Sequence, residues 1–123
     1  MIYPETILNI ADNSGAKTAK CLIVVKKPIG FLGDIIKITL RRFTASKKLI
    51  KGKKYFGLLI SVVKSKCRLN GYWLKFSKNR ILIFSENDKF IGTRVYGPSI
   101  RELKKRLLIS RFRRVISQSQ KIL

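Results

Sequence analysis

The chain has 123 residues, 46% of them hydrophobic, which is enough for one compact domain and too apolar for a disordered basic tail. Its 28 lysines and arginines against 6 acidic residues give a formal net charge of +22. A surface this cationic calls for a polyanionic partner, either nucleic acid or an anionic membrane surface. Because no apolar run approaches the ~20 residues of a membrane-spanning helix, we expect no membrane insertion.

The first five residues have neither the basic and apolar regions of a signal peptide nor the arginine-rich pattern of a transit peptide. If the protein works in an organelle, we therefore expect it to be made there.

Six short segments have the apolar, β-branched and aromatic patterns of strands, separated by turn signals. They are residues 6–10, 16–26, 34–40, 55–63, 72–76 and 80–84. This spacing predicts a mainly β fold, a small closed barrel or a sandwich. No internal repeat or composition shift marks a second domain, so residues 1–123 are expected to form one domain.

Two connections stand out between these segments. Asn70-Gly71 lies between two β-like runs and predicts a hairpin with a type I′ turn. Residues 41–54 form the most cationic run, which predicts a basic loop or hairpin tip.

The chain changes character at residues 91–103. Gly92 and Gly97 bracket a short segment in which alternation predicts that Arg94 points outward if Val95 enters the core. Pro98 suits the first position of a helix, and apolar residues then recur at helical spacing. We expect a β body over residues 1–97 and a basic helical tail over 98–123, helical to about residue 117. A simpler interpretation of Arg94 is an ion pair with a carboxylate such as Glu102.

Catalytic and metal sites are not indicated. The chain has no histidine, and its acidic residues are scattered. Cys21 and Cys67 lie far apart without a neighbouring cysteine, so two buried free thiols are favoured over a disulfide or a zinc site.

The cations gather in four places and could form one broad face that binds phosphates of a nucleic acid. The predicted contacts are Lys17, Lys20, Arg41, Arg42, Lys47, Lys48, Lys51, Lys53, Lys54, Lys64, Lys66, Arg68, Arg101, Lys104, Lys105, Arg111, Arg113 and Arg114. The lysines at 47–54 are the first choices because a loop can follow a backbone.

Aromatic residues near the cations could stack on bases. They are Phe43, Tyr55, Phe56, Tyr72, Trp73 and Phe76, and for most of them a place in the core is the simpler interpretation. The basic end at residues 111–114, around Phe112, would also suit a membrane surface, but it lacks a tryptophan or a broad apolar face.

Two motifs carry a family resemblance. The sequences ADNSGAK at 11–17 and GTRVYGP at 92–98, followed by REL at 101–103, resemble the signatures of the universal large-subunit ribosomal protein fourteen family in its bacterial-type form. GDIIKI at 33–38 and, loosely, residues 62–68 also resemble that family.

The resemblance implies a five-stranded β-barrel with a helical C-terminal extension, no cofactor and a structural role. It implies contacts with large-subunit rRNA, to which it adds Asn13, and with neighbouring ribosomal proteins. It further implies that Thr93 and Arg94 lie on a face toward small-subunit rRNA, where a ribosome-silencing factor also docks.

The chain departs from the family in a more basic turn at 77–80 and in its last residues, 117–123. Its richness in Ile, Leu, Lys, Phe and Ser is typical of an AT-rich genome. We expect a mitochondrial ribosomal protein encoded in the organelle, with a plastid or the bacterial cytoplasm as alternatives. The alternative function is a free-standing barrel that binds single-stranded nucleic acid.

Overall fold

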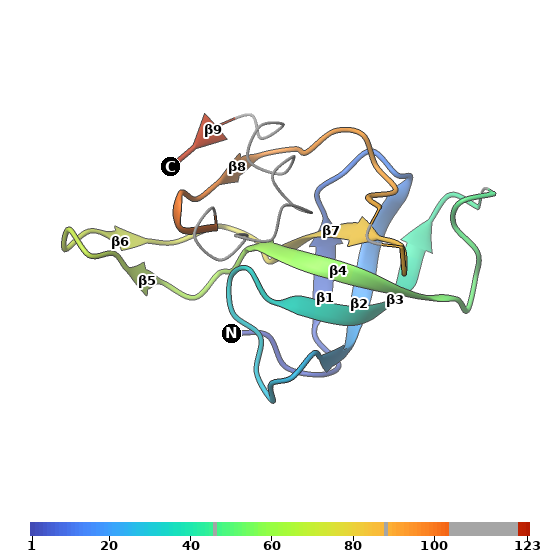
Figure 1. Ribbon diagram of the computed structural model, residues 1–123, viewed down its shortest axis with the longest axis horizontal. Coiled ribbons are helices and arrows are strands. Elements are labelled where there is room, and N and C mark those ends of the chain that lie inside the picture. Colours follow the sequence, from blue (N-terminus) through green and yellow to red (C-terminus); the bar gives the residue numbers. More distant parts are fainter. Residues whose placement is uncertain (46, 88, 104–120) are drawn as a thin grey trace.

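The computed structural model describes residues 1–45, 47–87, 89–103 and 121–123. Five strands close into a barrel in the order β1-β2-β3-β4-β7 (Figure 1), which confirms the predicted mainly β fold. The barrel strands are β1 (Ile7–Ile10), β2 (Ala16–Val24), β3 (Ile35–Phe43), β4 (Lys54–Ser61) and β7 (Arg80–Phe84).

The barrel is closed by the pairing of its first and last strands. Neighbours from β1 to β4 pair antiparallel, as do β4 and β7. β1 and β7 pair parallel, with Asn9 opposite Arg80 and Ile10 opposite Ile81. Closure leaves no open strand edge in the barrel.

The core lies inside the barrel and continues beyond β7. In β3, Ile36 and Ile38 are fully buried, as the alternation predicts. The last four residues of β7 are all buried, so both faces of this strand are covered.

The chain after β7 returns along it, where the Ile91 N–H donates to the Ile83 carbonyl at 3.2 Å. The Phe90 and Phe84 rings meet edge to face, with centroids 5.9 Å apart. The segment at 90–100 is therefore held against the barrel.

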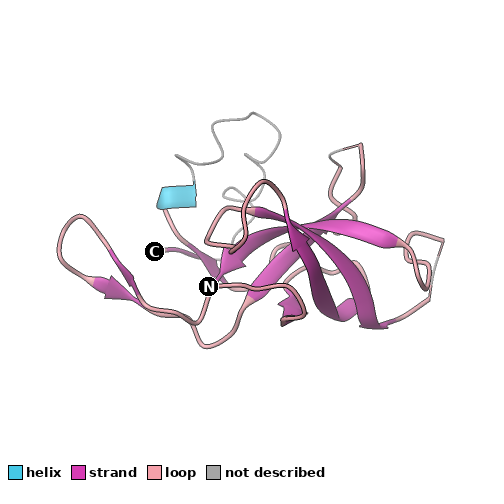
Figure 2. Ribbon diagram, turned by 90° about the horizontal axis from the view of Figure 1, so that it is seen from below, coloured by secondary structure: helices cyan, strands magenta, loops and turns pink. Residues whose placement is uncertain are grey.

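The strand predicted at 72–76 is not a barrel strand. It shortens to β6 (Trp73–Leu74), which pairs with β5 (Lys66–Cys67) in a separate two-stranded hairpin. This hairpin projects from the barrel in both views (Figures 1 and 2). Each of its strands has two residues, of which Leu74 packs against the core while Trp73 is exposed.

The hairpin at Asn70-Gly71 is confirmed, but the predicted type I′ turn is wrong. Gly71 has a φ of +86°, whereas Asn70 is not among the residues with positive φ. The Gly71 N–H donates to the Arg68 carbonyl, and the Arg68 N–H donates to the Tyr72 carbonyl. This is a three-residue loop, a type I turn followed by a left-handed glycine.

The predicted helix start at Pro98 is also wrong. Pro98–Ser99 forms strand β8, parallel to β9 (Lys121–Ile122). In the described part of the chain only Glu102 and Leu103 are helical (Figure 2). The rest of the predicted helix, residues 104 to about 117, lies outside the described residues. Pairing with a distant strand overrides the local helix-start signal of Pro98.

Cys21 and Cys67 are both free, as predicted. Cys21 is buried in β2, but Cys67 is exposed, so its predicted burial is wrong. The reason is that β5 stands outside the barrel.

Candidate functional site

The two sequence motifs at 11–17 and 92–98 meet on the barrel surface. The Tyr96 N–H donates to the Ala11 carbonyl at 2.7 Å, and Asp12 forms an isolated β-bridge with Val95. Val95 is buried, with 6% of its surface exposed, while Arg94 is exposed. This confirms the expected alternation, so the site presents Arg94 to solvent.

The Asp12 carboxylate fixes the loop of the first motif. Asp12 is buried, and its Oδ2 accepts the Ile83 backbone N–H of β7 at 3.1 Å. Its Oδ1 accepts both the N–H and the hydroxyl of Ser14. A buried carboxylate needs such donors, and here they attach the loop to the barrel wall.

The Asn13 side chain connects the two motifs directly. Its Oδ1 accepts the backbone N–H groups of Thr93 at 2.7 Å and Arg94 at 3.0 Å. Its Nδ2 donates to the Thr93 hydroxyl at 2.8 Å. We call Asn13, Thr93 and Arg94 with these bonds the Asn13 clamp.

Arg80 supports the far end of the same segment. Its guanidinium donates to the Tyr96 carbonyl at 3.0 Å, the Pro98 carbonyl at 3.2 Å and the Ser61 hydroxyl at 3.0 Å. Partial burial lowers the pKa of this guanidinium. Gly97 has a φ of +83°, and a Cβ there would lie 1.7 Å from Arg80 Nη1, so the backbone favours glycine, and any side chain there would displace the Arg80 guanidinium. Sequence analysis missed this role of Arg80.

Predicted phosphate contacts gather at one end of the barrel. Lys17 lies in β2 beside Thr18, which pairs with Arg42 in β3. The 44–53 loop that follows β3 is anchored by buried Leu49 and by Tyr55, whose hydroxyl accepts the Ile50 N–H. The lysines of this run are exposed: Lys47, Lys48, Lys51, Lys53 and Lys54. Arg41 and Arg42 are exposed too, so this end is strongly cationic.

Lys20 lies in β2, where it forms an ion pair with Glu5. Its charge is therefore partly balanced within the chain.

A second group of cations lies at the β5–β6 hairpin, opposite the 44–53 loop along the long axis (Figure 1). It comprises Lys64, Lys66, Arg68 and Arg101. Apart from Lys20, the predicted phosphate contacts in the described part of the chain thus lie in two groups, one at the 44–53 loop and one at the β5–β6 hairpin.

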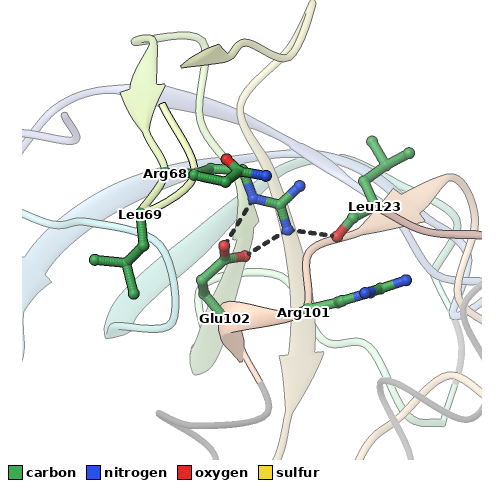
Figure 3. A pocket seen from close by; sticks show the side chains of 6 residues that line it. Arg68, Leu69, Arg101, Glu102 and Leu123 are labelled. Atoms are coloured by element: carbon green, nitrogen blue, oxygen red, sulfur yellow. Dashed lines mark hydrogen bonds and ion pairs between the residues drawn. The ribbon is translucent and has the colours of Figure 1, made fainter. Parts of the chain in front are cut away.

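Arg68 in the second group is engaged inside the protein (Figure 3). Its Nε and Nη2 donate to the two Glu102 oxygens at 2.8 and 3.1 Å, and Nη2 also donates to the Leu123 carbonyl at 2.9 Å. The hydrogen bond from Arg68 lowers the pKa of Glu102. Glu102 is thus bound to Arg68, and the simpler interpretation of an Arg94–Glu102 pair is wrong.

Lys104, Lys105, Arg111, Arg113 and Arg114 lie outside the described residues.

Most of the aromatic residues considered for stacking lie in or against the core: Phe43, Tyr55, Phe56 and Phe76. Tyr72 and Trp73 are 72% and 70% exposed on the hairpin, where stacking is open to them.

In the part of the chain that the structure describes, no helix has the length and apolar content to cross a membrane. Nor do three or more His, Cys, Asp or Glu residues lie close enough there to hold a metal ion.

Comparison with known protein families gives a match that spans the whole chain. The family model described as Ribosomal protein L14p/L23e matches residues 1–123.

Proposed function

Because this chain belongs to the ribosomal protein L14p/L23e family, and is therefore a structural protein of the large ribosomal subunit, we propose that it binds large-subunit rRNA and forms part of the interface with the small subunit. Neighbouring large-subunit proteins and small-subunit rRNA are its further partners. A ribosome-silencing factor is proposed to dock on the same face as the small subunit.

The exposed cations at one end of the barrel support rRNA binding. Lys17, Arg41 and Arg42 come from adjacent strands, and the exposed lysines of the 44–53 loop region continue the same surface. Lysine and arginine at such density suit phosphates, which fix position without reading sequence. These residues are proposed as the main rRNA contacts.

The exposure of Thr93 and Arg94 supports the interface role, and it is the observation on which that role depends. Both side chains are exposed on a segment whose backbone is fixed by the Asn13 clamp and by Arg80. Arg94 has charged donors suited to a phosphate across an interface.

The alternative, a free-standing barrel for single-stranded nucleic acid, has one observation in its favour. Tyr72 and Trp73 are exposed beside the cations of the hairpin, as stacking platforms are. Its sedimentation would differ, because such a protein would not stay with large subunits at moderate salt.

The mitochondrial ribosome is the proposed location, because the chain is rich in the amino acids that an AT-rich genome favours. Co-purification with mitochondrial ribosomes, compared with plastid or bacterial ones, would test this.

Sucrose gradients of ribosomes carrying Arg94→Glu test the proposal. We expect the variant to enter large subunits normally and to change the free energy of unfolding by no more than about 0.5 kcal/mol, since one exposed charge contributes little. Subunit joining should weaken about tenfold or more, because a reversed charge removes a charge-assisted bond and adds repulsion.

Lys26→Glu is the matched control, since Lys26 is exposed in the turn after β2 and lies outside the proposed contacts. It makes the same change in net charge and should leave joining normal. Normal joining and normal factor binding by Arg94→Glu would refute the interface role. Absence of the wild-type chain from large subunits would refute the ribosomal role.

A further inference from the structure

We infer that Asn13 is a positioning residue, which holds Thr93 and Arg94 in the orientation that meets the small subunit. This inference rests on the proposed interface role of Thr93 and Arg94. It replaces the expected role of Asn13 as an rRNA contact.

The first argument is the hydrogen-bonding capacity of the Asn13 amide. A carbonyl oxygen has two lone pairs, and Oδ1 gives them to the N–H groups of Thr93 and Arg94. One Nδ2 proton goes to the Thr93 hydroxyl. Two backbone donors at one atom also fix which end of the amide is oxygen. Only one N–H remains for RNA, which makes Asn13 a weak candidate for a phosphate or base contact.

The second argument is the rigidity of the surface from which Asn13 acts. Its neighbour Asp12 is buried and bound to the Ile83 N–H in β7. A Cβ on Gly92 would lie 2.7 Å from the Asp12 Cβ and 3.0 Å from Asn13 Oδ1. The two segments are thus in such close contact that only glycine fits at 92. Because the neighbouring Asp12 is bound to β7, Asn13 holds the backbone of Thr93 and Arg94 in a fixed position relative to that strand.

The third argument is what the Asn13 clamp leaves available. The Asn13 side chain binds the backbone N–H groups of Thr93 and Arg94, but it does not bind the Arg94 guanidinium. It makes the Thr93 hydroxyl an acceptor toward Asn13, so the hydroxyl proton is directed elsewhere. Both side chains therefore offer donors outward, as a phosphate of small-subunit rRNA requires. Ordering the segment beforehand lowers the entropy cost of docking.

The experiment compares Asn13→Ala and Asn13→Asp with Arg94→Glu, and uses Asn87→Ala, at an exposed turn residue, as the matched control. Three quantities are measured: incorporation into large subunits, subunit joining in gradients, and hydrogen exchange of the Thr93 and Arg94 amides in the full isolated chain.

For Asn13→Ala we expect normal incorporation, amide exchange at 93 and 94 faster by roughly tenfold, and joining weakened severalfold. Asn13→Asp keeps an acceptor for both amides, and the Thr93 hydroxyl can turn to donate to it. Its amide exchange should stay within about twofold of wild type, with joining between wild type and Asn13→Ala. Asn87→Ala should change none of the three quantities.

Reduced incorporation of Asn13→Ala with slow amide exchange would overturn the inference in favour of an rRNA contact. Normal joining of Asn13→Ala, while Arg94→Glu joins poorly, would overturn it as well. If Asn13→Ala does not fold, fast amide exchange in Asn13→Asp would overturn it. Normal joining by Arg94→Glu would instead show that the proposed interface role has failed, and the inference would fall with it.

Discussion

At the scale of single residues, the side chains that organise the site act over long distances in sequence. Asp12 reaches Ile83, Asn13 reaches Thr93, and Arg80 reaches Tyr96 and Pro98. The motifs pointed to the Asp12-Asn13 loop and to Arg94, and alternation placed Val95 on the face opposite Arg94. Nothing local distinguishes Arg80 or Arg68 from solvent-facing cations, because their acceptors are fixed only once the barrel closes.

The two cysteines offer a test of the fold at this scale. Cys67 should react with a thiol reagent as fast as an exposed thiol does, because β5 stands outside the barrel. Cys21 is fully buried, and burial raises its pKa. A raised pKa means a smaller thiolate fraction at any pH near 8, and the thiolate is the reactive form.

We therefore expect one thiol to react in native buffer and two in urea, counted by mass spectrometry. A Cys67→Ser variant is the control and should show no fast reaction. Rapid labelling of Cys21 in that folded variant would contradict the placement of β2 in the barrel wall.

At the scale of elements, strands whose apolar residues pack inside the barrel were predictable. Outside the barrel, the Asn70-Gly71 turn signalled the β5–β6 hairpin, but nothing signalled the pairing of β8 with β9. β7 matches its predicted range at 80–84, and β1, β3 and β4 differ from theirs at the ends. β2 stops at Val24, two residues before Lys26, whose φ is +63°. β8 and β9 carry no periodic signal of their own, since each has two residues and its partner is remote.

The turn at Gly97 ties these elements together, and its substitution gives a prediction with an internal control. Gly97→Ala should lower the free energy of unfolding by about 1–2 kcal/mol for the left-handed backbone. It should lose a further ~1–3 kcal/mol, because displacing Arg80 breaks the charged hydrogen bonds from its guanidinium to the Tyr96 and Pro98 carbonyls. Urea unfolding monitored by circular dichroism measures the total.

Gly52→Ala is the control. Gly52 has a φ of +80°, similar to that of Gly97, but a Cβ there would meet nothing within 4 Å. Gly52→Ala should therefore lose only the stability that the left-handed backbone costs an alanine, about 1–2 kcal/mol. Equal losses for the two variants would mean that the Arg80–Gly97 contact adds no stability.

At the scale of the whole molecule, repulsion between the surplus positive charges destabilises the compact fold. A closed barrel with a continuous core carries a net charge of +22, and most of the predicted phosphate contacts that the structure describes lie in two groups. Among the described residues, Glu5, Asp34 and Glu102 form ion pairs with cations, which is too few acids to balance such a surface. Composition predicts a polyanionic partner, but it could not show how the barrel distributes the cations.

This repulsion predicts that salt acts with opposite sign on folding and on binding. In the free protein, raising KCl shortens the screening length from ~10 Å at 0.1 M to ~3 Å at 1 M. Repulsion between the cations weakens, so the free energy of unfolding should rise.

With roughly 6–10 phosphate contacts, affinity for protein-free large-subunit rRNA should fall by about 10³–10⁵ between 50 and 200 mM salt. Unfolding is measured in urea, because guanidinium is itself a salt. Sucrose at matched osmolality is the control and should leave the affinity nearly unchanged. An affinity that stays flat in salt would mean that the exposed cations do not contact phosphates. A stability that falls with salt would mean that the ion pairs of Glu5, Asp34 and Glu102 outweigh the repulsion of the surplus positive charge.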